Sequence, residues 1–322
     1  MAARYDSRVG PHATPVRLVA TDLDGTLLSP GGRVTARAAA AVAAARSLGI
    51  HVVPVTGRPP KSVWPIATAA GLGPLGVCSN GAVIVDLERH RVLETESIAG
   101  EVATRLVDLL RDAVPGVSLA TEHQERFFFE TGFFEVPVDW QEELHEVSDI
   151  RPVVTEGCTK LVVRHPDPAV DAPALTARLE QAVGEEGNVT TSGLDWVEIG
   201  APRVTKAYAL ERVCGRLGVH LSQVVAVGDN HNDLTVLGWA GQAMAPSNAI
   251  PEVLALVDRV LPSNGEHGVA QLLEQLVAAT VLQRSRRHMA GRYQGETCQL
   301  DLSESVTSDF VQQKSSWQVS PL

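Results

Sequence analysis

The chain has 322 residues, 44% of them hydrophobic, a size and composition that predict a globular protein of two domains with flanking tails. The formal net charge of −11 argues against nucleic acid as the main partner, so an anionic ligand would have to be held by a local positive centre. No apolar run approaches the ~20 residues that span a bilayer, and residues 1–15 lack a signal-peptide core, so we expect a cytoplasmic protein without a membrane partner.

The first part of the chain alternates between strand and helix patterns. Residues 16–22 form a short Val- and Leu-rich run, which is typical of a buried parallel strand. An Ala-rich segment follows, and it is predicted to be a helix with Thr35 as its N-cap and Gly49 at its end. The next elements are a strand, a helix and a strand, predicted over 51–57, up to Gly71 and over 75–85. This order predicts an α/β fold with a doubly wound, Rossmann-like parallel sheet.

The strand–helix rhythm is lost between about Asp86 and Ile199, which predicts an inserted α+β domain over 85–199. Its predicted elements are a helix over 172–185 and strands over 126–134, 159–166 and 194–200. The first of these strands carries five of the six Phe residues of the chain. Together with Trp140 it predicts either a hydrophobic core or a surface on which a ring could stack.

The α/β rhythm returns at about Val204 and completes the predicted core, which comprises 16–84 and 200–282. The predicted elements are a helix from Lys206, a strand that enters an acidic loop over 224–233, and helices near 234–239, 251–258 and 268–282. The polar remainder, 283–322, is predicted to be disordered, as is 1–15. The four cysteines are scattered without a CxxC pair and are expected to be isolated thiols.

Two carboxylates one residue apart follow the first strand in the stretch VRLVATDLDGTLL. Side chains two apart on an extended segment point to the same side, so we expect Asp22 and Asp24 to lie together at the carboxyl end of a central strand. At ~4 Å they would repel each other by ~4 kcal/mol at an effective dielectric of 20. A hard divalent cation such as Mg²⁺ would relieve that repulsion, whereas an ordinary Asp-Gly turn through Gly25 would need none.

A second acidic stretch, GDNHND, follows the Val-rich strand that begins at Val224. Because parallel strands end at the same edge of a sheet, Asp229 and Asp233 can converge with the first pair of carboxylates. Four carboxylates without a cation would be very unfavourable, which favours a metal site formed by Asp22, Asp24, Asp229 and Asp233.

Three further residues could hold an anionic substrate beside that metal. Lys206 is one of four lysines and opens a predicted helix, where a cation opposes the macrodipole; that local penalty fits a lysine directed at phosphate. Thr56 supplies a hydroxyl at a strand end, and Gly57 leaves its backbone N–H accessible. Taken alone, the lysine could equally be a solvated surface side chain and the Thr-Gly pair an ordinary turn.

Together these stretches resemble the four motifs of the haloacid dehalogenase-like superfamily, namely DLDGT (22–26), VTGRP (55–59), Lys206 and GDNHND (228–233). SNGA (79–82) and the closing segment AMAPSNAI resemble its Cof-like branch. That branch has a large α/β cap inserted between the second and third motifs, which fits 85–199 here. The resemblance covers roughly 16–280. His231 stands where the branch has a small residue, so its imidazole is expected to line the entrance or to face solvent.

The resemblance also implies a mechanism. Asp22 would attack phosphorus and form an aspartyl-phosphate, while Asp24 would protonate the leaving oxygen and then deprotonate the attacking water. Lys206 would neutralise charge on the phosphoryl group. The implied metal site binds Mg²⁺ through Asp22, the backbone carbonyl of Asp24, Asp229 and Asp233. The implied substrate-binding residues are Thr56, Gly57, Asn80 and Asn232.

The function predicted from these residues is a Mg²⁺-dependent phosphatase for a small phosphorylated metabolite, such as a sugar phosphate or phosphorylated cofactor, acting as a monomer or weak homodimer. The cap is expected to determine the substrate specificity. A phosphomutase or phosphotransferase on the same scaffold would pass the phosphoryl group to another acceptor. A metal-dependent glycosyltransferase, in which DxD holds a nucleotide-sugar diphosphate, predicts no role for Lys206 or Thr56. The intact set of Asp22, Asp24, Lys206 and Asp229 argues against a non-catalytic binding protein.

Overall fold

The computed structural model describes residues 15–123, 126–133, 143–167, 170 and 172–296. The chain forms two compact units, Met1–Thr280 and Val281–Leu322. All the elements that position the candidate site lie in the first unit. None of the described helices combines the length and the apolar character that a bilayer span requires.

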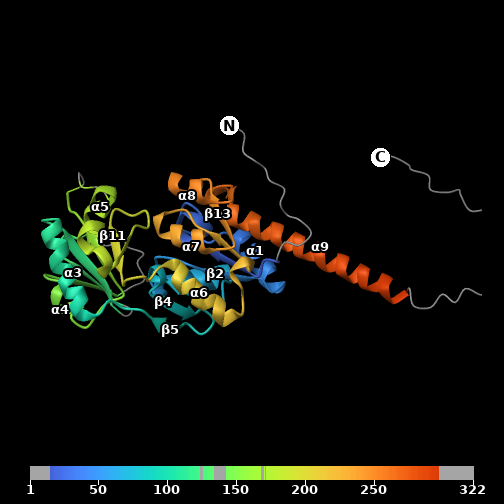
Figure 1. Cartoon of the computed structure of the whole chain (residues 1–322), viewed down its shortest axis with the longest axis horizontal. Helices are drawn as coiled ribbons and strands as arrows, with labels where there is room; N and C mark the ends of the chain where they lie inside the picture. The colour runs from blue at the N-terminus through green and yellow to red at the C-terminus, as the bar shows by residue number, and fades with distance from the viewer. Residues whose placement is uncertain (1–14, 124–125, 134–142, 168–169, 171, 297–322) are drawn as a thin grey trace, which may run out of the picture. The chain divides into compact units, whose positions relative to one another are not determined.

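A parallel sheet of five described strands forms the centre of the core (Figure 1). The strand order is β14 (Arg259–Leu261), β13 (Gln242–Pro246), β12 (Val224–Val227), β1 (Leu18–Thr21) and β2 (His51–Pro54). Alternate residues of each strand face opposite sides, so that Leu18 and Ala20 pack in one hydrophobic cluster and Val19 in another. Both faces are therefore buried, which explains why these strands read as continuous apolar runs.

Helices cover both faces of this sheet. On one face lie α1 (Ala36–Ser47), α2 (Pro60–Ala70) and the start of α9 (Gly268–Glu296). On the other face lie α6 (Lys206–Leu217), α7 (Leu234–Trp239) and α8 (Pro251–Leu256). The predicted N-cap of the first helix is confirmed, since the Thr35 hydroxyl accepts a hydrogen bond from the N–H of Ala38 at 3.2 Å. The core is thus the doubly wound α/β fold that the sequence predicts.

The run 75–85, expected as one strand, is a hairpin. β3 (Leu75–Cys78) and β4 (Val83–Asp86) pair antiparallel, and β5 (Arg91–Thr95) extends them to a separate sheet. The chain reverses because Ser79 and Asn80 adopt positive φ values of 50° and 55°. This reversal places the side chain of Asn80 next to the carboxyl ends of the core strands, where the site is formed.

Residues 118–200 contain a second sheet of six described strands, which belongs to the inserted cap domain. Its strand order is β10 (Asn188–Thr190), β11 (Val197–Gly200), β9 (Lys160–Arg164), β6 (Ser118–His123), β7 (Arg126–Glu130) and β8 (Glu143–Val147). The cap helices are α3 (Gly100–Ala113), α4 (Arg151–Val154) and α5 (Ala172–Val183), which lie at the left in Figure 1, where α3 contacts both α4 and α5. The exact limits of the cap, 85–199, remain a prediction.

The two faces of the cap sheet carry different side chains. Leu119 and Leu161 face the helices, whereas the neighbouring residues Ala120 and Val162 pack with the aromatic cluster on the other face. That cluster buries Phe127, Phe129 and Phe133. The core interpretation of this aromatic run is therefore confirmed for these three residues. Phe134 and Trp140 lie outside the described residues.

The last helix is longer than the sequence pattern indicates. α9 continues through Glu296, whereas the prediction placed disorder from 283 onward. The stretch QRSRRHMAGRYQGE lacks an apolar period, but four Arg and two Gln stand among its 14 residues, and both types have favourable helix propensities. Residues 1–14 and 297–322 lie outside the described residues, so the predictions there stay untested.

Candidate active site

Asp22 follows β1 directly and is only 7% exposed. Its N–H donates to the carbonyl oxygen of Val227 on β12 at 2.9 Å, which fixes the residue between the ends of two parallel strands. The chain then turns through a short helical segment, η1 (Leu23–Leu27). Gly25 allows this turn to approach the next acidic loop, because a Cβ at its position would lie 2.3 Å from Oδ2 of Asp229.

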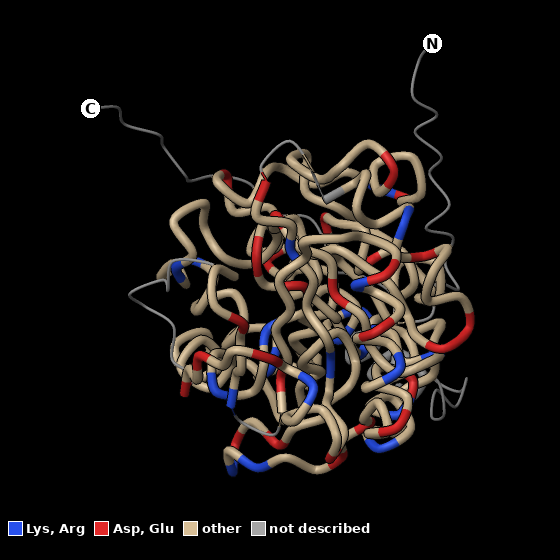
Figure 2. Tube along the Cα trace, turned by 90° about the vertical axis from the view of Figure 1, so that its left-hand side faces the viewer, with Lys and Arg blue, Asp and Glu red and all other residues tan. Residues whose placement is uncertain are grey.

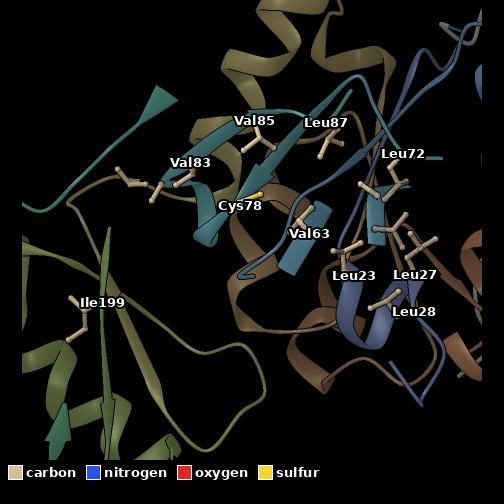
Figure 3. Packing of buried hydrophobic residues seen from close by; sticks show 14 of the residues in the cluster. Leu23, Leu27, Leu28, Val63, Leu72, Cys78, Val83, Val85, Leu87 and Ile199 are labelled. Carbon is tan, nitrogen blue, oxygen red and sulfur yellow. The ribbon is translucent and has the colours of Figure 1, made fainter. Parts of the chain in front are cut away.

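Apolar side chains anchor the turn that follows the candidate nucleophile. Leu23, Leu27 and Leu28 belong to the same buried cluster as Val63 of α2 (Figure 3). Leu23 and Leu28 are completely buried. The stretch that bears the candidate nucleophile is therefore held by the hydrophobic core on one side, while Asp22 and Thr26 contact Lys206 and Asp229 on the other.

Lys206 begins α6 and lies between two carboxylates. Its Nζ is 2.7 Å from Oδ1 of Asp22 and 2.6 Å from Oδ1 of Asp233. Burial of this side chain disfavours its charge, but the two carboxylates outweigh that effect and raise its pKa well above the usual value. The ammonium group therefore stays charged. The alternative of a solvated surface lysine is excluded, because the side chain is fully buried.

Three of the four predicted carboxylates converge. Asp22, Asp229 and Asp233 each offer an oxygen, and these oxygens lie within 4.8 Å of one another. The Thr26 hydroxyl donates to Oδ1 of Asp229 at 2.5 Å, and Oδ2 of Asp233 accepts the N–H of Asp229 at 3.0 Å. Burial first, and then the neighbouring carboxylates, raise the pKa of Asp22 and bring that of Asp229 to about 6. An all-oxygen donor set under such repulsion fits a hard divalent cation such as Mg²⁺.

The side chain of Asp24 does not join this group. Both of its carboxylate oxygens accept hydrogen bonds from Arg58, whose Nε and Nη2 lie 2.7 and 2.6 Å away. The carboxylate is 48% exposed. The expectation that Asp22 and Asp24 point to the same side is wrong, because the strand ends at Thr21 and the helical turn begins at Leu23. Only the backbone carbonyl of Asp24 remains a candidate metal ligand, as the family resemblance implies.

The candidate substrate-binding residues lie close to one another. Nδ2 of Asn232 donates to Oδ1 of Asn80 at 3.0 Å. A Cβ at Gly57 would lie 3.0 Å from the same Oδ1 atom, so this glycine contacts Asn80 as well. Thr56 is buried, and its hydroxyl accepts the N–H of Arg58 at 3.1 Å. The structure thus brings the second motif, the SNGA turn and the acidic loop into one place.

Sequence reasoning missed several residues that hold these loops. Arg58 and Thr26 stand inside quoted motifs, so their positions were a usable signal. Asn248 likewise stands inside the segment AMAPSNAI, and its Nδ2 donates to the carbonyl oxygen of Gly25 at 2.8 Å. Its Oδ1 accepts the N–H of Asn264 at 2.9 Å, so one amide joins two loops to the turn after β1.

Comparison with known proteins decides the family. The sequence model of the haloacid dehalogenase-like hydrolases matches residues 19–273. The chain belongs to this family. Among curated relatives of this hydrolase, YxeH of Bacillus subtilis (strain 168) is 30% identical over 275 residues, which cover 82% of this chain and 99% of that protein. The pyridoxal phosphate phosphatase YbhA of Escherichia coli (strain K12) is 28% identical over 268 residues, with 80% and 97% covered.

Solved structures agree with the fold of this haloacid dehalogenase-like hydrolase. A haloacid dehalogenase-like hydrolase from B. subtilis has a TM-score of 0.70 at 24% identity and covers 80% of this chain and 99% of its own. The subclass IIB sugar phosphatase BT4131 has a TM-score of 0.70 at 18% identity, with 81% and 98% covered. These likenesses show the fold. The named phosphatases among the sequence relatives support a phosphatase activity for this chain, and the Cof-like resemblance is consistent with them.

Proposed function

We propose that this hydrolase is a Mg²⁺-dependent phosphatase that moves the phosphoryl group of a small metabolite to Asp22 and then to water. One observation carries the proposal, namely the buried contact of 2.7 Å between Lys206 Nζ and Asp22 Oδ1 beside a group of three carboxylates. A carboxylate nucleophile, a fixed cation and a metal-binding donor set are the parts that phosphoryl transfer needs.

Each candidate residue has a role in this proposal. Asp22 attacks phosphorus, and Lys206 orients that carboxylate and balances negative charge on the transferring group. Thr56, Asn80 and Asn232 hold the phosphoryl oxygens. Bound Mg²⁺, held by Asp22, Asp229, Asp233 and the backbone carbonyl of Asp24, supplies further positive charge beside the phosphoryl group.

In this proposal Asp24 transfers the proton. Its carboxylate must first break its hydrogen bonds with Arg58 to reach the oxygen of the leaving group. Its exposed position allows that movement, since its carboxylate is 48% exposed in the present arrangement. Cap residues lie directly over the acidic loop, because the carbonyl oxygen of Thr191 accepts the N–H of Asn232 at 3.2 Å. Such a cover excludes water while the aspartyl-phosphate forms.

We place the enzyme in the cytoplasm, as a monomer or weak homodimer that acts on a small molecule. Acidic and basic residues are interspersed along the folded trace (Figure 2), and the net charge is −11. Both features support a small phosphorylated substrate over nucleic acid.

Phosphate release from a panel of phosphorylated metabolites tests the proposal. We expect release with Mg²⁺, its loss after chelation, and its loss in the folded variant Asp22→Asn. Activity that survives this substitution would exclude the covalent mechanism. Phosphate release that depends on added bisphosphate, with transfer to a sugar hydroxyl, would favour a phosphomutase.

A further inference from the structure

A cavity of about 750 Å³ extends from Lys206 and Asn232 to the cap. This volume is typical of a small-molecule site. One face of α5 forms part of the wall, through residues spaced i, i+3, i+4 and i+7, namely Pro173, Thr176, Ala177 and Glu180. The opposite face of α5 buries Leu175 and Leu179 in the cap core, so the helix holds the first set in place.

Hydroxyl and amide groups dominate the polar lining of this cavity. The cap contributes Thr176, Asn188 and Thr190, and the core contributes Asn230 and Thr235. These side chains can donate hydrogen bonds to hydroxyl groups and accept hydrogen bonds from them. The walls therefore suit a ligand that is rich in hydroxyls.

Aromatic side chains are scarce in the described lining, where the imidazole of His231 is the only aromatic ring. No Phe, Tyr or Trp occurs among the lining residues of the part of the chain that the structure describes. The described cap aromatics pack against one another instead, as Phe133 does with Trp196 at a ring separation of 6.2 Å. A flat ring such as pyridoxal could therefore stack only on His231, an exposed residue of the acidic loop.

The charge of the lining is asymmetric. Lys206 lies on the core wall, and Glu180 on the cap wall is the only carboxylate among the described lining residues. Glu180 is exposed to solvent, and the ion pairs of the described residues do not include it. A substrate with a second phosphate or a carboxylate would meet like charge at this wall.

We propose that the cavity takes a sugar or polyol monophosphate whose leaving group is uncharged, and that Glu180 is a specificity-determining residue. Its carboxylate accepts hydrogen bonds from hydroxyl groups of the leaving group and repels a second anionic group. This inference rests on the proposed phosphatase function, and it names the substrate class for the same site.

The test compares kcat/KM values of the Mg²⁺-loaded full chain. Hexose and pentose monophosphates and a hexitol phosphate are compared with pyridoxal phosphate and a hexose bisphosphate. We expect the best monophosphate to exceed the other two classes by at least about tenfold. The variant Glu180→Lys is expected to lower the ratio of monophosphate to bisphosphate kcat/KM by at least about tenfold, and Glu180→Gln to lower it by a smaller factor.

Glu185→Lys is the matched control. It makes the same change of charge at an exposed position in the segment after α5 (Gly184–Glu186), outside the cavity lining, so the ratio should stay at the wild-type value. A preference for pyridoxal phosphate or bisphosphate, or equal ratios in Glu180→Lys and Glu185→Lys, would overturn the inference. Absence of phosphate release from every ester, p-nitrophenyl phosphate included, would instead count against the phosphatase function itself.

Discussion

Lys160 Nζ lies 2.6 Å from Oε1 of Glu198 and 3.0 Å from the carbonyl oxygen of Gly57. The lysine and the glutamate belong to the cap, on β9 and β11, whereas the glycine belongs to the core. Glu198 also accepts a hydrogen bond from Nδ2 of Asn80 at 3.1 Å, and Asn80 in turn accepts one from Asn232. A buried polar connection therefore runs from the cap sheet to the residues proposed to hold phosphate.

Replacement of Lys160 by Met should lower the free energy of unfolding by about 3–5 kcal/mol, because buried carboxylates lose their cation. Glu198 would lose its ion pair, and Oε2 of Glu122, which lies 3.6 Å from Nζ, has no hydrogen-bond partner among the described residues. Urea denaturation measures the loss. The double variant Lys160→Met with Glu198→Gln should lose less than the sum of the two single changes. A single variant within about 1 kcal/mol of wild type would contradict this account.

Gly25→Ala should abolish the stabilisation by Mg²⁺, because the added Cβ would lie 2.3 Å from Oδ2 of Asp229 and displace it. Gly32→Ala is the matched control, since Gly32 has a similar φ of 68° but nothing within 4 Å of the place that its added methyl group would take. Both substitutions should lower the free energy of unfolding by about 1–2 kcal/mol, because a residue with a Cβ is strained in the left-handed backbone conformation. Thermal denaturation with and without Mg²⁺ distinguishes the two variants. An equal rise in Tm on addition of Mg²⁺ would refute the role of the close contact between Gly25 and Asp229.

Stability should depend on pH and metal together. Burial is the largest cause of the raised pKa of Asp22 and of the pKa of about 6 at Asp229. A carboxyl group with a raised pKa binds its proton more tightly in the folded state, so the contribution of these two groups to the stability of the metal-free protein should fall as the pH rises from about 4 through 6. Mg²⁺ competes with these protons, so it should raise Tm more at about pH 7.5 than at about pH 5. Equal rises in Tm at both pH values would argue against these carboxylates as ligands.

Asp24→Asn should reduce the turnover of an alkyl phosphate by about 10²–10⁴-fold, the usual contribution of a general acid–base group. The reduction should be smaller for p-nitrophenyl phosphate, because its leaving group departs without a proton. The Mg²⁺-dependent rise in Tm should persist, since the side chain of Asp24 lies outside the group formed by Asp22, Asp229 and Asp233. Equal losses of turnover for both esters would assign Asp24 a role other than proton transfer.

The local sequence was sufficient to predict the core of the fold. Val-rich runs such as 224–227 predict strands buried on both faces, and Thr35 marks the start of the first helix through its own hydrogen bond. Because parallel strands end at one edge, the order of elements also predicts that Asp22 and Asp229 meet. These properties depend on residues close in sequence or on a general rule of topology.

Only the tertiary structure decided how side chains distant in sequence share partners. Asp24 turns to Arg58, and Lys160 joins two glutamates of the cap to the core. Which face of α5 lines the cavity depends on which face packs into the hydrophobic core of the cap. No local pattern encodes such contacts, because they follow from packing between elements and from the need to pair each buried charge.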